Sequence, residues 1–512
     1  MNEAILTHDE AYPSGWRVIA CLLMAGLADL LFYNEGLGWT AGFFTFVILS
    51  TLLFFNPSLV LTRPNKVIIA INFVWVLALI ENPSGLTLTL AFLGVTTIAL
   101  LSHPGWIHNA GLWLRGILDF WTQNVLKVFM DLKFIKYLFQ SENHRSRSSI
   151  QLKNWILPLG LSLVFVFLFA GANPVLIRWL DLVNWNWIVD FLTLERILLW
   201  SLAITLSWPL LRPKFRLKQH FPESEFSRKA HAVIHYLFST DSILYSLILF
   251  NILFSIQTLM DIIYLWGGAT LPENMSYAEY AHRGAYPLIA TALLAGGFVL
   301  VALRPGSETD KIPFIRYLVY FWIGQNVFLV ISSIWRTTLY IEEYSLTYLR
   351  LSAMIWMGLV ALGLVWLVLR ILWSRSNTWM INLNGFTLLA VLMICAFINL
   401  GGVIARFNVE HCKEVRGRGP ALDLQYLKEI GLASLPALHW YQQHGHQNNY
   451  TMSRVLKLDR DLQHSLGQEL EDWRTWTFRK YRLALQADAG KKLRTSIGSS
   501  GWRIAPNKNG FR

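Results

Sequence analysis

Long apolar stretches separated by short polar connections are the feature that most constrains this chain. Between Val18 and Ile404 about eleven runs are each long enough to cross a ~30 Å hydrocarbon core as a helix. A bilayer offers the backbone no hydrogen-bonding partner, so such runs must be helical. We therefore predict an all-α polytopic transmembrane bundle, with spans at residues 18–34, 40–61, 66–81, 86–102, 154–177, 191–211, 240–265, 285–303, 315–338, 347–372 and 380–404.

The composition agrees with a lipid environment. Charged residues are 15% and apolar residues 54% of the 512 residues, whereas ordinary soluble domains carry about 25% charged residues. The net charge of +12 lies mostly in the connections, where it orients the protein, so we expect no nucleic-acid partner. Three widely spaced cysteines, Cys21, Cys395 and Cys412, predict neither a disulfide framework nor a Cys-rich metal site. We expect no metal and no cofactor.

The connections alternate between basic and acidic. Those containing Arg63, Arg216, Arg304 and Arg375 are basic, as is the long one at 105–153, and each is separated from the next by two spans. Lys and Arg are retained on the cytoplasmic side, so an odd number of spans places the amino terminus in the cytoplasm and the carboxyl terminus outside.

Four parts follow from this reading of the chain. They are the N-terminal transmembrane helices (1–104), a cytoplasmic amphipathic segment (105–153), the main transmembrane bundle (154–404) and a polar, basic, extracytoplasmic tail with short helices (405–512). Within the second part, residues 106–139 repeat apolar residues at helical spacing among lysines, which predicts a helix lying on anionic lipid headgroups. Docking of a cytoplasmic or membrane protein partner on this segment is the alternative.

Polar and aromatic residues gather at the outward ends of the later spans. Arg350 lies about one turn inside its span, where an arginine facing lipid costs roughly 2.5–3.5 kcal/mol, so it should face protein or water, with Glu343 or Glu279 as its partner. We predict an outward-facing polar vestibule; the alternative is an ordinary aromatic belt with ion pairs that lock helix ends. This outer polar cluster comprises Glu279, Tyr280, Arg283, Arg336, Glu343, Tyr344, Thr347, Arg350, Asn399, Arg406 and Asn408.

Four strings in the second half carry a family resemblance: YAEYAHRGAYPLIA, IEEYSLTYLRLSA, IARFNVEHC and LDLQYLKEIGLASLPAL. Their order resembles a bacterial multi-pass membrane family known as domain of unknown function 4173. The resemblance implies location in the bacterial inner membrane. It implies no activity, because that family has no established one. The residues it marks as a signature are Tyr280, Arg283, Gly284, Glu343, Tyr344, Thr347, Arg350, Asn399, Arg406, Asn408, Asp423 and Tyr426.

No motif of soluble-enzyme chemistry occurs in the chain, which leaves three functional classes open. The first is a noncatalytic membrane protein that serves as an accessory or sensor component. The second is a transporter or channel for a small solute, favoured if Asn251, Gln257 and Asp261 face the same cavity as Arg350. The third is a membrane-embedded enzyme on a lipid-linked or cell-envelope substrate, favoured if Glu279 or Glu343 has a raised pKa in a cleft.

The topology can be tested with reporter fusions or cysteine accessibility. Positions Arg216 and Ser307 should be cytoplasmic, and Glu273, Glu342 and Asp472 should be outside, because basic connections stay in the cytoplasm. A cytoplasmic Asp472 would overturn the odd number of spans.

Overall fold

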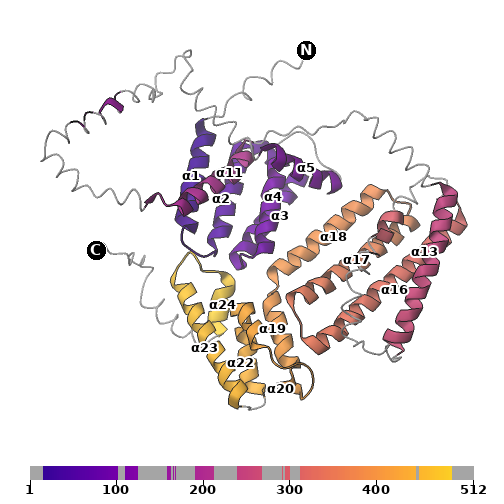
Figure 1. Cartoon of the computed structure of the whole chain (residues 1–512). Helices are drawn as coiled ribbons and strands as arrows, with labels where there is room; N and C mark the ends of the chain where they lie inside the picture. The colour runs from indigo at the N-terminus through magenta and orange to yellow at the C-terminus, as the bar shows by residue number, and fades with distance from the viewer. Residues whose placement is uncertain are drawn as a thin grey trace, which may run out of the picture. The chain divides into compact units, whose positions relative to one another are not determined.

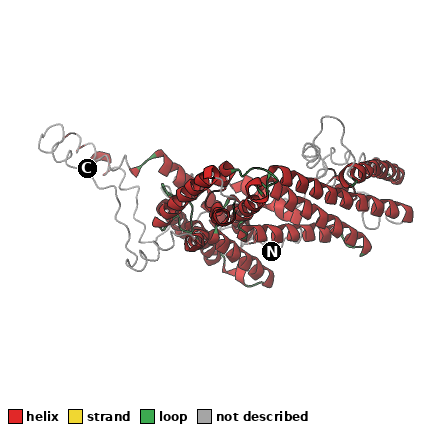
Figure 2. Ribbon diagram, turned by 90° about the horizontal axis from the view of Figure 1, so that it is seen from below, coloured by secondary structure: helices red, strands yellow, loops and turns green. Residues whose placement is uncertain are grey.

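The described part of the protein is built from α-helices joined by short turns. The computed structural model describes residues 15–101, 110–124, 191–212, 239–267, 294–299, 312–445 and 449–486, with single positions 158, 160–162, 165, 168 and 291. Figure 2 shows helices and no strand in these residues. The predicted all-α fold is confirmed.

The chain divides into two units. One comprises Met1–Trp106 with Trp113–Leu217, and the other Ile107–Leu112 with Lys218–Arg512. In Figure 1 the helices of the first unit are indigo to magenta, and those of the second run from magenta through orange to yellow.

The first unit packs α1 (Gly15–Phe32) against α11 (Leu194–Leu211), far apart in sequence. Near one end of the pair, Arg196 Nε donates to Asp29 Oδ1 at 2.7 Å and Trp200 Nε1 donates to the same oxygen at 3.1 Å. Near the other end, Cys21 and Met24 pack against Trp208 and Leu211. The two helices are therefore antiparallel, with a polar clamp at one end and an apolar contact at the other.

The remaining helices of this unit form its core. Among the described residues they are α2 (Thr40–Phe55), the short 3₁₀ helix η1 (Pro57–Val60), α3 (Arg63–Glu81), α4 (Gly85–Leu101) and, from Trp113 onward, α5 (Ala110–Asn124). Trp113 and Trp121 of α5 donate from Nε1 to the hydroxyls of Thr97 and Thr96 on α4, at 3.0 and 3.2 Å. Protein thus covers one face of α5, the described part of the 106–139 segment. Binding of anionic headgroups by that segment stays a prediction.

The second unit contains four long apolar elements: α13 (Thr240–Met260) continued by the π-helical turn η2 (Asp261–Trp266), α16 (Pro313–Tyr344), α17 (Tyr348–Leu372) and α18 (Asn377–Phe397). Asn251 contacts Leu318 and Asp261 contacts Arg336, so α13 and α16 run in the same direction. Short turns then reverse the chain between α16, α17 and α18. Their shared core includes Leu247, Trp322, Met357, Leu364 and Met380.

Six of the described helices are long and apolar enough to cross a membrane: α3, α11, α13 with η2, α16, α17 and α18. Helices α2 and α4 are apolar but shorter. The protein is therefore a membrane protein. Most of the predicted spans 154–177 and 285–303 lies outside the described residues, so the number of eleven spans stays a prediction. The predicted span 380–404 ends earlier: α18 stops at Phe397, and the Asn399 side chain caps a new helix.

The tail folds into a helical domain, which we call the tail domain. It comprises α19 (Leu400–His411), α20 (Lys413–Arg416), α21 (Leu424–Ile430), η3 (Gly431–Ser434), α22 (Leu435–His444), α23 (Asn449–Glu471) and α24 (Phe478–Gln486). Val409, Leu438, Tyr441, Val455 and Leu466 are fully buried in its core. Burial raises the pKa of Tyr441 to about 12, which keeps its hydroxyl neutral.

An ion pair links α22 to α23 beside this core. His439 Nε2 lies 3.0 Å from Asp459 Oδ1, and Gln463 Nε2 donates to Asp459 Oδ2 at 2.9 Å. Burial by itself would raise the pKa of Asp459, but His439 and Gln463 outweigh it, and the pKa is lowered from its ordinary 3.8.

This pair predicts an acid-sensitive tail domain. Because the folded-state pKa of Asp459 is below 3.8, its contribution to stability is complete above pH 3.8 and is lost as the pH falls through the lower folded-state value. Amide hydrogen exchange in α22 and α23, corrected for the intrinsic rate, should therefore accelerate in that range. The Asp459→Asn protein should be less protected at pH 6 and should change less on acidification. Equal pH dependence in both proteins would contradict the assignment.

Candidate functional site

The outer polar cluster predicted from the sequence is only partly within the described structure. Glu279, Tyr280 and Arg283 lie outside the described residues. Of the other eight residues, four meet at the turn between α16 and α17, three belong to α19 or its cap and one, Arg336, lies deeper between α13 and α16. The turn between α16 and α17 holds the largest of these groups. Its members are Tyr344, Thr347 and Arg350, with the exposed Glu343 just before them.

Arg350 binds the end of the helix that precedes it. Its Nη1 donates to the main-chain carbonyl oxygens of Tyr344 and Ser345, and its guanidinium carbon lies 4.3 Å from the centre of the Tyr340 ring. The last carbonyls of a helix have no partner within the helix and attract a cation. The prediction that Glu343 holds Arg350 is therefore wrong: Glu343 is exposed, and Arg350 donates to carbonyl oxygens instead. The alternative partner, Glu279, lies outside the described residues, so that pairing stays a prediction.

The same turn is held by the tail domain. Asn408 of α19, 8% exposed, accepts the Leu346 N–H at Oδ1 (2.7 Å) and donates from Nδ2 to the Leu346 carbonyl (2.8 Å). The Tyr426 hydroxyl of α21 accepts the N–H of Tyr348 at 2.9 Å. Thr347 caps α17 by accepting from the Arg350 N–H at 3.4 Å. Both main-chain groups of Leu346 and the N–H of Tyr348 thus have side-chain partners in the tail domain.

Asn399 and Arg406 act within the tail domain. The Asn399 side chain accepts the N–H of Gly402 at 3.1 Å and so begins α19. Arg406 forms an ion pair with Glu410 and lies 4.7 Å above the Trp440 ring. These contacts bind helix ends and helix faces to one another; the polar vestibule itself stays a prediction.

Arg336 takes part in a buried ion pair that the sequence did not predict. Its Nη2 donates to Oδ1 of Asp261, at the point where α13 becomes the π-helical turn η2. Arg336 is 3% exposed and Asp261 is fully buried. Gln257 Nε2 donates to the same carboxylate oxygen at 2.9 Å. Among the described residues, the other carboxylate oxygen of Asp261 has no hydrogen-bond partner.

The pair belongs to a polar stripe along the α13–α16 interface. Asn251 Nδ2 donates to the Leu318 carbonyl at 3.1 Å, Gln325 Nε2 donates to Ser255 Oγ at 2.6 Å, and Trp266 Nε1 donates to Ser332 Oγ at 3.2 Å. Gln325, Ser332 and Arg336 recur at i, i+7 and i+11, which is one face of a helix. That spacing could have revealed the stripe, whereas the identity of the partner helix could not be read from it.

The chemistry available here is binding and positioning. In the described ranges no three His, Cys, Asp or Glu side chains come together in a way that could hold a metal ion. The strong interactions are charge-assisted hydrogen bonds to helix ends and across helix interfaces.

Removing either member of the Asp261–Arg336 pair should destabilise the protein strongly. Arg336→Met leaves a buried carboxylate without its counter-ion, for which we expect a loss of about 3–5 kcal/mol, and Asp261→Leu should cost a similar amount. The double variant should lose far less than the sum, because neither charge remains. The measurement is unfolding free energy in mixed micelles by denaturing-detergent titration. As a control, Arg406→Met breaks an exposed pair and should cost under about 1 kcal/mol; additive losses would contradict coupling.

Comparison with known proteins gives a family but no activity. One protein-family model, the domain of unknown function 4153, matches residues 67–441. No curated protein matches the chain, and no solved structure does either.

This finding corrects the resemblance drawn from the sequence. The four strings lie within residues 277–438, inside the matched range, but the family is 4153 and the resemblance to 4173 is wrong. The match also begins in α3, well before the first string. Tyr, Arg and Glu are common at the helix ends of membrane proteins, where they contact carbonyl oxygens and the membrane interface. Sequence strings rich in these residues therefore do not distinguish one membrane family from another. The chain belongs to the family known as domain of unknown function 4153.

Proposed function

We propose that this protein is an accessory or sensor component of the cytoplasmic membrane, in which the tail domain is mechanically coupled to transmembrane helices α16 and α17. In this proposal the amino terminus is cytoplasmic and the tail domain lies outside, where it would meet a partner or a signal. Transport of a small solute is the second candidate.

The observation that carries the proposal is the pair of hydrogen bonds between the Asn408 side-chain amide and the main chain of Leu346. One side chain of the tail domain satisfies both main-chain groups of one residue in the α16–α17 turn, at 2.7 and 2.8 Å. A buried N–H or C=O left without a partner costs about 1–3 kcal/mol. Movement of α19 relative to the turn is therefore opposed by two groups at once.

Apolar packing reinforces this coupling. Ile341 and Leu346 of the turn region form one buried cluster with Ile404 of α19, and Tyr426 and Ile430 of α21 pack against it. Gly401 also allows close approach, since a Cβ there would overlap the Tyr348 hydroxyl. Displacing the tail domain would expose this cluster to water.

The tail domain also offers apolar groups to a partner. Tyr450 and Leu456 on α23, and Trp473 and Phe478 near α24, are large and exposed. Aromatic residues of this kind are enriched where proteins bind one another. An accessory component would use such a surface for its partner, and the coupled turn would connect that contact to α16 and α17.

The coupling can be measured as a distance distribution. Spin labels at exposed Lys457 of α23 and Leu362 of α17 should give a narrow distribution in the full chain, because the tail domain is fixed on the turn. Asn408→Ala should broaden this distance distribution, because the N–H and C=O of Leu346 lose their partner in the tail domain and bind water instead. Gln425→Ala, which removes an exposed amide elsewhere in the tail domain, is the matched control. An equally narrow distribution in Asn408→Ala would overturn the proposed coupling.

A second candidate, transport of a small solute, is supported by the α13–α16 stripe. Asn251 Oδ1, Gln325 Oε1 and Asp261 Oδ2 are buried acceptor oxygens without a hydrogen-bond partner among the described residues. Unsatisfied acceptors within a membrane helix pair are costly and are found along ion or solute paths. Solute flux into vesicles that contain the purified protein, abolished by Asp261→Asn, would favour transport over the accessory role.

A further inference from the structure

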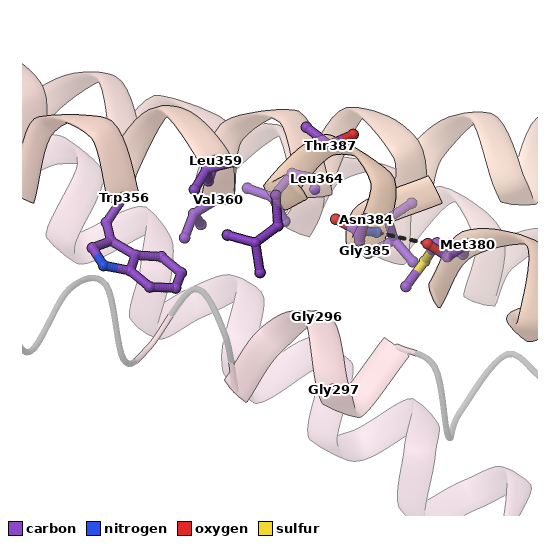
Figure 3. Close-up of a pocket in the computed structure, with 13 residues that line it drawn as sticks. Gly296, Gly297, Trp356, Leu359, Val360, Leu364, Met380, Asn384, Gly385 and Thr387 are labelled. Atoms are coloured by element: carbon purple, nitrogen blue, oxygen red, sulfur yellow. Dashed lines mark hydrogen bonds between the residues drawn. The ribbon is translucent and has the colours of Figure 1, made fainter. Parts of the chain in front are cut away.

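A cavity of about 450 Å³ lies between α17, α18 and the helical residues 294–299 (Figure 3). Leucine, valine and tryptophan side chains form most of its wall. On the third side Gly296 and Gly297 face it, and a Cβ added at either position would meet nothing within 4 Å. The absence of side chains at these two glycines therefore contributes to the open space.

The cavity extends along α17. Its lining on α17 extends from Trp356 to Leu367, which is roughly 16 Å at 1.5 Å per residue. That length is about half of a ~30 Å hydrocarbon core, the depth of one leaflet. Because α17 and α18 are both membrane-spanning helices and most of α18 is not buried in protein, the surrounding solvent is lipid.

Each of the two polar side chains in the wall already makes at least one hydrogen bond within the protein. Asn384 Nδ2 donates to the Met380 carbonyl at 2.9 Å, and Thr387 Oγ1 donates to the Leu383 carbonyl at 2.8 Å and accepts from Trp366 Nε1 at 3.1 Å. An apolar occupant would leave neither of them without a partner. The wall thus favours a hydrocarbon chain over a polar solute.

Positive charge lies at one end of the cavity. One helical turn beyond the Leu367–Met380 end, the Nη2 of Arg370 donates to Asn377 Oδ1 at 2.5 Å, and Arg375 is exposed in the following turn. The sequence contains no Asp or Glu between Glu343 and Glu410, so α17 and α18 carry no acidic residue that would neutralise the exposed Arg375. Trp373 and Trp379 lie at the same end, with ring centres 6.2 Å apart, as is usual at the headgroup level.

We infer that the cavity binds one acyl chain of an anionic glycerophospholipid, whose phosphate lies at the α17–α18 turn beside the exposed Arg375. The hydrocarbon wall and the one-leaflet length match the acyl chain of such a lipid, and the basic end matches its anionic headgroup. The inference does not depend on the accessory role proposed above, because it involves neither the tail domain nor the α16–α17 turn.

Native mass spectrometry of the full chain in detergent tests this inference. Equal amounts of phosphatidylglycerol and phosphatidylethanolamine with identical chains should yield mainly the phosphatidylglycerol adduct. Arg375→Gln should weaken that adduct about fivefold, the effect of one basic residue near an anionic headgroup. It should weaken the phosphatidylethanolamine adduct less, because the ammonium group of that lipid already compensates its phosphate. Gly297→Leu fills the cavity and should weaken both adducts.

Two matched variants separate the site from general effects. Arg63→Gln removes an exposed arginine at the start of another span, and Gly324→Leu adds the same side chain to an open position on α16; neither should change lipid binding. Adducts unaffected by Gly297→Leu, or a headgroup preference unaffected by Arg375→Gln, would overturn the inference. A dimer that Gly297→Leu disrupts without changing the adducts would also overturn it, since a second helix would then occupy the glycines.

Discussion

The buried pair of Asp261 and Arg336 is the interaction on which the arrangement of the second unit depends. Each ion is removed from water by protein, and either one alone would cost several kcal/mol. Their attraction offsets this cost only if α13 and α16 stay in one register, because a shift of one residue would turn Arg336 away from the carboxylate. The hydrogen bonds of Asn251, Gln325 and Trp266 require the same register of α13 against α16. Together they specify which face of α16 packs against α13.

Helix α16 carries that register to the tail domain. Its 32 residues make it about 48 Å long, well beyond a ~30 Å hydrocarbon core, so its last turns project toward the headgroup level or past it. Arg336 lies two turns before the end, and Leu346, which Asn408 binds, follows the end directly. One stiff helix thus connects a contact fixed by charge inside the bundle to a contact fixed by hydrogen bonds at its surface.

The sequence predicts the elements of this fold better than their partners. The length of the apolar run locates α17 to within one residue, since the predicted span is 347–372 and the helix is Tyr348–Leu372. Ser345, with a positive φ of 68°, ends α16 just before it. Hydropathy fails at residues 398–399, since the apolar face of α19 packs in the tail-domain core and looks like a continued span. It also fails for side-chain partners: Asp261 is 75 residues from Arg336, and Arg350 binds carbonyl oxygens that every helix end possesses and no sequence pattern marks.

Helix α17 connects the tail-domain contact to the basic end of the cavity. One end begins at the turn that the tail domain holds, and the other, roughly 37 Å away at 1.5 Å per residue, ends at the basic turn beside the cavity. Coupling between the two ends of α17 requires a structural element that has two arrangements. A single well-packed helix has only one arrangement and does not provide such coupling by itself. The π-helical turn at Asp261 departs from regular helix geometry where, among the described residues, one buried carboxylate oxygen has no hydrogen-bond partner, and α16 packs against both this turn and α17. The charged pair therefore fixes the register of α16, and α16 in turn packs against the helix that ends beside the cavity.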